Sequence, residues 1–378
     1  MKIQIAAILL ISILLTPIAG AIAPEEKVPV IIGFKDKPDA ALVREHGGEI
    51  KHQYIIINAI AANLPVKAIE KLRTHAKISY IEADSIAHAL GETTPWGIAK
   101  INATQVWTQY NNKGTGIKVA ILDTGIQYDH PDLKANIKGG VNFVGWTRDG
   151  NTNPKYWTDK NGHGTHVAGI VAAVNNTIGV VGVAPEASLY AVKVLNDAGS
   201  GYYSDIVQGI EWSINNNMQI ISMSFGGTSD SQALKDACDK AKKRGIVLIA
   251  AAGNSGDGNP NTDNVLYPAK YDSVIAVAAT DSSDSVPSWS SDGSEVDVAA
   301  PGVSILSTYK GSSYATMSGT SMAAPHVTGT VALMLSAGVK GDIQSKLQST
   351  AWDIVVPGPD VFSGYGRIDA ARAVSELN

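Results

Sequence analysis

The sequence is almost without cysteine and has no surplus of positive charge. Its 378 residues include one cysteine, Cys238, which excludes an intramolecular disulfide framework and any metal site built from several cysteines. With 30 Lys and Arg residues against 35 Asp and Glu residues, the formal net charge is −5. This charge argues against a nucleic-acid-binding function, because phosphate contacts need a cationic surplus. Charged residues make up 17% and hydrophobic residues 44%, which excludes a disordered chain.

Long apolar runs are also scarce. The run at residues 5–15 follows Lys2 and is shorter than the roughly 20 apolar residues that span a membrane. Ala21 and Ala23 then form a small-x-small cleavage site, so residues 1–23 are predicted to be a signal peptide and the protein to be secreted. An uncleaved membrane anchor is the alternative. No later stretch of the sequence is long and apolar enough to cross a bilayer.

Residues 24–90 have the pattern of a small α+β unit. Apolar runs with strand-like and helix-like spacing alternate along it, at residues 28–34, 39–46, 49–65, 66–73 and 78–82. The resulting order β-α-β-β-α-β predicts a split βαβ, ferredoxin-like sheet with its helices on one face. A unit of this size is marginally stable alone and is expected to need a partner surface.

Residues 91–378 alternate apolar, β-branched runs with helical patterns. The strand-like runs are residues 117–122, 188–194, 220–224, 247–252 and 274–279. Strands that are apolar on both faces and separated by helices predict a parallel sheet covered on both sides, which is a three-layer α/β domain. Functional sites in such folds lie beyond the carboxyl ends of the strands.

Two residues that suit acid–base chemistry are predicted at such ends. Asp123 ends the first strand of this domain, where a turn or helix-cap role is the alternative. His163 lies near the start of a helix rich in small residues. His163 and His166 are three apart on one helix face and form an alternative metal pair, but neither a zinc-protease glutamate nor a third ligand is evident. A core role is favoured for His166.

A hydroxyl and an amide complete the set. Ser321 precedes an apolar helix whose dipole favours developing negative charge, although an N-cap serine explains the residue equally well. Asn254 follows a strand, either as a turn residue or as a hydrogen-bond donor. Together with Asp123 and His163, they provide the nucleophile, base, orienting carboxylate and oxyanion donor that acyl transfer needs.

The segments around these side chains resemble the subtilisin family of serine proteases. The resemblance is carried by residues 121–125, 163–169 and 319–323, in the chain order Asp, His, Ser. It implies a serine endopeptidase whose subtilisin-like catalytic domain spans 91–378. It also implies that residues 24–90 are a propeptide that acts as intramolecular chaperone and inhibitor.

The same resemblance assigns the catalytic roles. Asp123 would orient His163, His163 would act as general base and then acid, and Ser321 would be the nucleophile. Asn254 and the Ser321 backbone N–H would form the oxyanion hole. An esterase is disfavoured because the G-x-S-x-G elbow is absent around Ser321. The sequence is also compatible with a non-catalytic peptide-binding relative and with a signal-anchored membrane protease.

Substrate binding and processing also follow from the resemblance. Protein and peptide substrates would bind by strand addition along exposed backbone edges. The cut that releases the propeptide is placed between Leu90 and Gly91. A leucine directly before the cut implies an apolar preference at the substrate's P1 position. The mature enzyme is expected to be a monomer. The substrate-binding positions implied are Ser222, Ser224, Gly226, Gly253, Gly201 and Tyr203. For Tyr203, ordinary surface packing is the alternative.

Calcium is the cofactor that the resemblance implies, since the candidate ligands are all oxygen atoms. Glu92 is expected to reach the first site only after the propeptide is cut off. A longer segment between Asp123 and His163 offers further oxygen ligands and is either a second calcium site or a solvated turn. The first site would use Glu92, Asp132, Val174, Asn176, Ile178 and Val180. The second would use Asp149, Asn151, Asn153 and Asp159.

Overall fold

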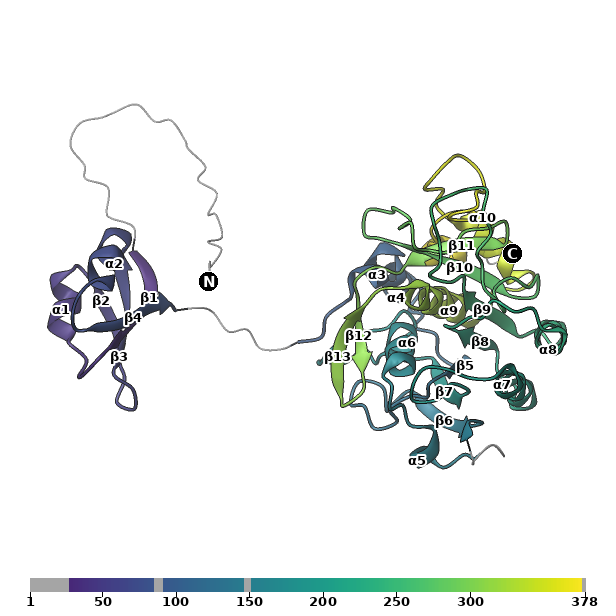
Figure 1. Ribbon diagram of the computed structural model, residues 1–378, viewed down its shortest axis with the longest axis horizontal. Coiled ribbons are helices and arrows are strands. Elements are labelled where there is room, and N and C mark those ends of the chain that lie inside the picture. The colour runs from purple at the N-terminus through teal and green to yellow at the C-terminus, as the bar shows by residue number, and fades with distance from the viewer. Residues whose placement is uncertain (1–26, 85–90, 146–150, 376–378) are drawn as a thin grey trace. The chain divides into compact units, whose positions relative to one another are not determined.

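The computed structural model describes residues 27–84, 91–145 and 151–375 (Figure 1). The predicted signal peptide, Leu90 and Asp149 lie outside these residues. The chain forms two compact units, Met1–Ala89 and Leu90–Asn378. No helix of the described residues is long and apolar enough to cross a membrane.

The N-terminal unit is a four-stranded antiparallel sheet in the order β2-β3-β1-β4. Asp39 begins the first helix by accepting the backbone N–H of Leu42 at 3.0 Å. The apolar core between the sheet and the helices includes Ile32, Ile60 and Leu72. The β-α-β-β-α-β order matches the prediction. Its elements are β1 (Lys27–Phe34), α1 (Ala40–Glu45), β2 (Glu49–Gln53), β3 (Ala59–Pro65), α2 (Val66–Arg73) and β4 (Ile78–Ala83).

The C-terminal unit is built on a seven-stranded parallel sheet in the order β11-β10-β9-β8-β5-β7-β6. A separate antiparallel hairpin pairs β12 with β13. The predicted parallel α/β fold is confirmed. The sequence did not predict β6 and β11, which are the two edge strands of the sheet. An edge strand pairs with a neighbour on one side only. Strand β6 also contains Gly139 and Gly140, and glycine weakens a strand pattern. The strands are β5 (Lys118–Asp123), β6 (Ile137–Asn142), β7 (Ser188–Lys193), β8 (Ile220–Met223), β9 (Val247–Ala251), β10 (Ile275–Thr280), β11 (Val296–Pro301), β12 (Ile305–Tyr309) and β13 (Ser313–Met317).

Helices cover both faces of this sheet, so the unit has three layers. Successive residues of β5 point to opposite faces: Val119 and Ile121 enter one core cluster, with α6 and α9, and Ala120 and Leu122 enter the other, with α7 and α8. Figure 1 shows these two helix pairs on opposite sides of the strands. The helices are α3 (Trp96–Lys100), α4 (Ala103–Gln109), α5 (Pro154–Trp157), α6 (His163–Ala172), α7 (Tyr203–Asn215), α8 (Gln232–Lys243), α9 (Thr320–Ser336), α10 (Ile343–Thr350) and α11 (Ala370–Ser375).

The three layers bring polar residues to the carboxyl edge of the sheet. Strand β5 ends at Asp123, and β9 ends just before Gly253 and Asn254. Helix α6 begins with His163 on one face, and α9 carries Ser321 as its second residue. Segments far apart in the sequence therefore meet at one edge, as the parallel arrangement predicts.

Candidate active site

A buried carboxylate and an imidazole form the centre of this edge. Asp123 is 0% exposed, and its Oδ1 and Oδ2 lie 2.8 and 3.0 Å from Nδ1 of His163. The backbone N–H of Thr124 donates to Oδ1 of Asp123 at 2.7 Å. Because a carboxylate only accepts, Nδ1 of His163 carries the proton and Nε2 is left as the basic nitrogen.

The pKa of His163 reflects two opposing effects. Burial lowers it, but the negative charge of Asp123 and its hydrogen bond outweigh the burial, and Asp159 adds a further attraction, so the pKa is raised above 6.5. Among the described residues, His166 has no such carboxylate partner. Its Nε2 faces the carbonyls of Ile305 and Ala315 at 3.1 and 3.0 Å, and burial lowers its pKa to about 4. His166 is therefore a neutral core residue.

Ser321 shares a cleft of about 390 Å³ with His163 and Asn254. Its hydroxyl donates to the backbone carbonyl of Ser224 at 2.9 Å, and its only hydrogen-bond acceptor among the described residues is this carbonyl rather than the imidazole. The cleft is lined by Thr124, Asn161, His163, Leu195, Gly199, Ser224, Phe225, Gly226, Ala251, Gly253, Asn254, Ser255, Leu266, Thr320 and Ser321.

The side chain of Asn254 is held in one orientation. Its Oδ1 accepts the backbone N–H of Thr320 at 2.9 Å and the Thr320 hydroxyl at 3.0 Å. A backbone N–H can only donate, so the atom that faces it must be Oδ1, which leaves the amide Nδ2 for a ligand in the cleft. Thr320 was not singled out from the sequence, although its position directly before Ser321 was a usable signal.

This arrangement has the parts of an acyl-transfer site: a hydroxyl, a basic nitrogen held by a buried carboxylate, and an amide donor in one cleft. Comparison with known proteins points to the same chemistry. The subtilase family matches residues 114–366.

The chain belongs to the subtilase family.

Two of the relatives below span nearly the whole sequence, and a third spans three quarters of it. Subtilisin E of Bacillus subtilis (strain 168) is 46% identical over 365 residues, which cover 94% of this chain and 92% of the relative. M-protease of Shouchella clausii (strain KSM-K16) is 41% identical over 394 residues, which cover 98% of each chain. Subtilisin DY of Bacillus licheniformis is 51% identical over 286 residues, covering 75% of this chain and 99% of the relative. This subtilase is a serine endopeptidase.

The predicted substrate positions divide into two groups. Ser224, Gly226 and Gly253 line the cleft of this subtilase. Ser222 does not: it is 0% exposed, and its Oγ accepts the hydroxyl of Thr328 at 2.9 Å, which joins β8 to α9. Two residues apart on one strand, Ser222 and Ser224 would point to the same face. Strand β8 ends at Met223, however, so Ser224 lies beyond the strand and only Ser222 belongs to it, which is why the prediction for Ser222 failed.

Gly201 also lies outside the cleft. A Cβ at Gly201 would lie 2.2 Å from the carbonyl oxygen of Val194, so this glycine serves close backbone packing, and Gly199 lines the cleft in its place. Tyr203, the first residue of α7, is half-buried, and its hydroxyl donates to the carbonyl of Ser229 at 2.9 Å.

Leu266 is a cleft residue that sequence reasoning missed. A Cβ at Gly226 would lie 2.6 Å from Cβ of Leu266, and a Cβ at Gly253 would lie 2.8 Å from its Cγ. The leucine side chain therefore lies between the two glycine segments. Its backbone N–H donates to the carbonyl of Ala252 at 2.8 Å, which fixes it there. No local sequence signal marks Leu266, because only the fold brings it to the cleft.

Hydrogen bonds bring together several residues of the predicted first calcium site. Asp132 is 0% exposed, and burial raises its pKa. Its carboxylate accepts Nδ2 of Asn176 at 2.7 Å and the backbone N–H of Val180 at 2.9 Å. The N–H of Val174 donates to the carbonyl of Asp132 at 2.9 Å. A buried carboxylate held by these neutral donors beside carbonyl and amide oxygens fits a hard cation.

Glu92 lies at this loop. Its carboxylate accepts the backbone N–H of Asn176, and it accepts Nδ2 of Asn175 at 2.8 Å. The neighbouring Thr93 pairs with Val180, and Oδ1 of Asn176 accepts the N–H of Ile178 at 2.7 Å. The expectation that Glu92 arrives only after cleavage stays a prediction, because the junction at residues 85–90 lies outside the described residues.

The structure gives the predicted second calcium residues other contacts. Asn151 and Asn153 form turns, each accepting a backbone N–H two residues later at 3.0 Å. Asp159 is 5% exposed, and both of its oxygens accept hydrogen bonds from the start of α6 and from Thr124. The described residues contain no group of three or more His, Cys, Asp or Glu that could hold a metal. We therefore propose no second metal site and no His163–His166 metal pair.

Three histidines should separate in an NMR titration of the imidazole signals. His163 should titrate above pH 6.5, because the nearby carboxylates favour its charged form, while His166 and His326 should titrate at about 4, because burial favours their neutral forms. His→Gln variants assign the three signals. A His163 signal that titrates at or below pH 6.5 would contradict the arrangement described above.

Proposed function

We propose that Asp123, His163 and Ser321 are the catalytic triad of this serine endopeptidase. The observation that carries the proposal is the hydrogen-bonded Asp123–His163 pair at the cleft that also contains Ser321. In this mechanism Nε2 of His163 takes the proton of the Ser321 hydroxyl as Oγ attacks the peptide carbonyl, and later gives it to the leaving amine. Asp123 keeps the proton on Nδ1 and stabilises the imidazolium. The Ser321 hydroxyl must first leave the carbonyl of Ser224.

The tetrahedral intermediate would be stabilised by two N–H donors. One is Nδ2 of Asn254, which is left for the cleft because Thr320 occupies Oδ1. The other is the backbone N–H of Ser321, which lies in the first turn of α9 and lacks an intrahelical acceptor. Donors that are already oriented gain strength as negative charge develops on the oxygen.

The cleft supports a preference for apolar P1 residues. Its proposed pocket lies between Ser224–Gly226 and Ala251–Gly253, with Leu266 between the two segments. Among the described residues that line the cleft, His163 is the only ionisable one, so no carboxylate is placed to bind an Arg or Lys side chain. Substrate backbones would pair with the exposed edges at Gly199 and Gly226, and Tyr203 would flank the first of them.

We propose that the chain is made as a secreted precursor. Residues 1–23 would be the signal peptide and 24–90 a propeptide that assists folding and inhibits the enzyme. Cleavage would fall between Leu90 and Gly91, releasing a monomeric enzyme of residues 91–378. The division of the structure into units at Ala89 and Leu90 supports a boundary there. Subtilisin DY supports it too, since 99% of that relative matches only 286 residues, or 75%, of this chain. A signal-anchored membrane protease is the second candidate, since residues 5–15 are apolar.

We propose that calcium binds at the loop held by Asp132. The ligands would be side-chain oxygens of Glu92, Asp132 and Asn176 and the carbonyls of Val174, Ile178 and Val180. Bound there, calcium would neutralise a buried carboxylate and tie Glu92, near the start of the catalytic unit, to the loop after α6. Its contribution would be to stability rather than to the chemical step.

Replacing Ser321 by alanine should abolish both peptide hydrolysis and maturation. The variant should accumulate as an uncleaved precursor because the nucleophile that cuts its own junction is gone. Mass spectrometry of the purified protein, with N-terminal sequencing of the wild type, measures both the cut and the fate of residues 1–23. Ser229→Ala, a serine on the surface near Tyr203, is the matched control and should mature normally. Normal maturation of Ser321→Ala in isolation would refute self-cleavage.

Peptide-library profiling should show apolar P1 residues preferred over Arg and Lys. Leu266→Ala should raise kcat/KM for a large P1 side chain such as Phe relative to Ala, by roughly 10-fold, because it removes the leucine side chain between Gly226 and Gly253. Leu195→Ala, elsewhere in the same cleft, is the control. A strict preference for Arg or Lys, or an unchanged Phe-to-Ala ratio in Leu266→Ala, would show that the pocket is assigned wrongly.

Calcium should raise the unfolding temperature of mature enzyme whose active site is blocked by a covalent serine reagent. At a calcium concentration about 100 times the dissociation constant, the stabilisation is about 2.7 kcal/mol. Asp132→Asn should remove this dependence, whereas Asp129→Asn, at an exposed carboxylate nearby, should keep it. If calcium stabilises Asp132→Asn as much as the wild type, the ion binds elsewhere.

A further inference from the structure

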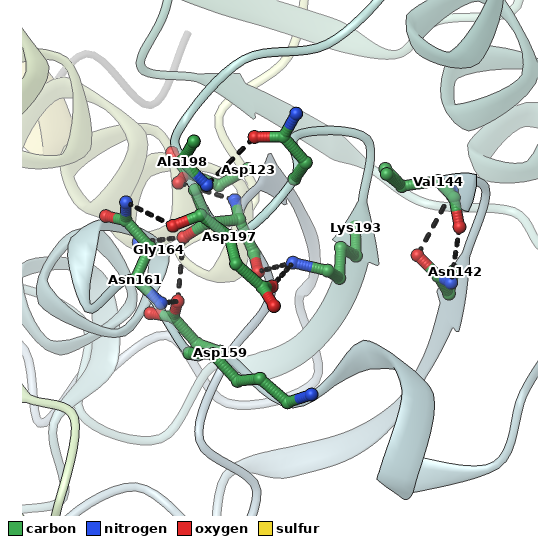
Figure 2. A network of polar contacts seen from close by, with 12 residues as sticks. Asp123, Asn142, Val144, Asp159, Asn161, Gly164, Lys193, Asp197 and Ala198 are labelled. Carbon is green, nitrogen blue, oxygen red and sulfur yellow. Dashed lines mark hydrogen bonds and ion pairs between the residues drawn. The ribbon is translucent and has the colours of Figure 1, made fainter.

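Asp159 is a buried anion with an unusually complete set of hydrogen bonds. Its Oδ1 accepts the hydroxyl of Thr124 and the backbone N–H groups of Asn161 and Gly162, each at 2.9 Å. Its Oδ2 accepts the backbone N–H and the hydroxyl of Thr165, at 2.9 and 2.7 Å. Figure 2 shows Asp159 and Asn161 from this network near Asp123. All five donors are neutral, so the negative charge of Asp159 is held without a cationic partner among them.

The five donors come from two elements, the end of β5 and the start of α6. Thr124 follows Asp123 at the end of β5, and the other donors surround His163 at the start of α6. Thr124 itself is doubly engaged, because its Oγ1 also accepts the backbone N–H of Gly164 at 3.0 Å. A rigid link between Asp123 and His163 therefore exists beside their own hydrogen bond.

Thr124 is also held from its other side. Nζ of Lys193 donates to the carbonyl of Thr124 at 2.7 Å and pairs with Asp197 at 2.9 Å. Figure 2 draws Lys193 and Asp197 in this same network. Lys193 is 6% exposed, but its charge is balanced by Asp197, so it does not neutralise Asp159.

We propose that Asp159 is a positioning residue of this active site, which fixes the start of α6 against the end of β5 and stabilises the positive charge that forms on His163. This inference rests on the proposed function. The sequence suggested Asp159 as a calcium ligand. The proposal gives this carboxylate a different role, since the five hydrogen bonds described above join it to Thr124 and to the start of α6.

The electrostatic part of the proposal has a definite sign. Among the described residues, the charged and titratable groups that act on His163 are Asp123 from β5, Asp159 before α6 and His166 within α6. The Lys193–Asp197 ion pair, from β7 and the loop after it, reaches this network through the carbonyl of Thr124. Asp159 raises the pKa of His163, so removing its charge should lower that pKa.

The test is Asp159→Asn, which keeps the shape of the side chain but removes its charge. An amide has one acceptor oxygen, so the donors on its NH₂ side lose their partner. Measured per active site after titration with a covalent serine reagent, kcat on the high-pH plateau should fall roughly 10- to 100-fold with KM nearly unchanged. The acid limb of the kcat profile should move to lower pH.

Two further variants separate the effects. Thr124→Val removes the tether to Asp159 but no charge, so it should lower kcat and leave the acid limb in place; it also tests the proposal if Asp159→Asn does not fold. Asp342→Asn removes a carboxylate that caps α10 at Gln344 and Ser345, and should leave kcat and the acid limb at their wild-type values.

An Asp159→Asn enzyme with wild-type kcat per titrated site, or with an unmoved acid limb, would overturn the proposal, and so would wild-type kcat in Thr124→Val. Failure of the proposed function looks different. In that case the serine reagent does not label the wild-type enzyme at Ser321, and the comparison of variants is never reached.

Discussion

The hydrogen bond between Nδ1 of His163 and the Asp123 carboxylate is the contact on which the site depends. It joins the last residue of β5 to the first residue of α6, and therefore the sheet to one of its covering helices. Both ends are fixed by backbone structure, because Asp123 belongs to a strand paired on both sides and His163 belongs to a helix packed in the core. A carboxylate buried in this way orients the imidazole without competing water.

The same contact distinguishes His163 from two fully buried histidines. His166 and His326 face backbone carbonyls, which accept a hydrogen bond but carry no net charge, and burial lowers the pKa of both residues. His163 is partly buried as well, yet two carboxylates more than compensate for that burial and raise its pKa. The pKa values of these three histidines therefore differ more because of their partners than because of how deeply each is buried.

Much of the fold and the central residues could be predicted from the sequence, because each depends on local patterns. Apolar runs on both faces predict parallel strands, and a polar residue directly after such a run predicts a position at the carboxyl edge, as for Asp123 and Asn254. Leu266 could not be found this way, since its role depends on which strands become neighbours. Ser222 was misplaced because the end of β8 was not visible in the sequence, and Asp159 because a carboxylate that caps a helix and one that binds metal look alike there.

The order of strands in the large sheet has a consequence for how the chain reaches this structure. The central strand β5 pairs with β8, so that Val119 lies beside Ile220, and β8 in turn pairs with β9. To form such a pair, the chain must close a long loop, and it loses the entropy of that loop before the new contact stabilises it. Topologies of this kind fold slowly. The residues of the cleft come from segments that are far apart in the chain, so the catalytic surface exists only once these distant parts of the domain have met.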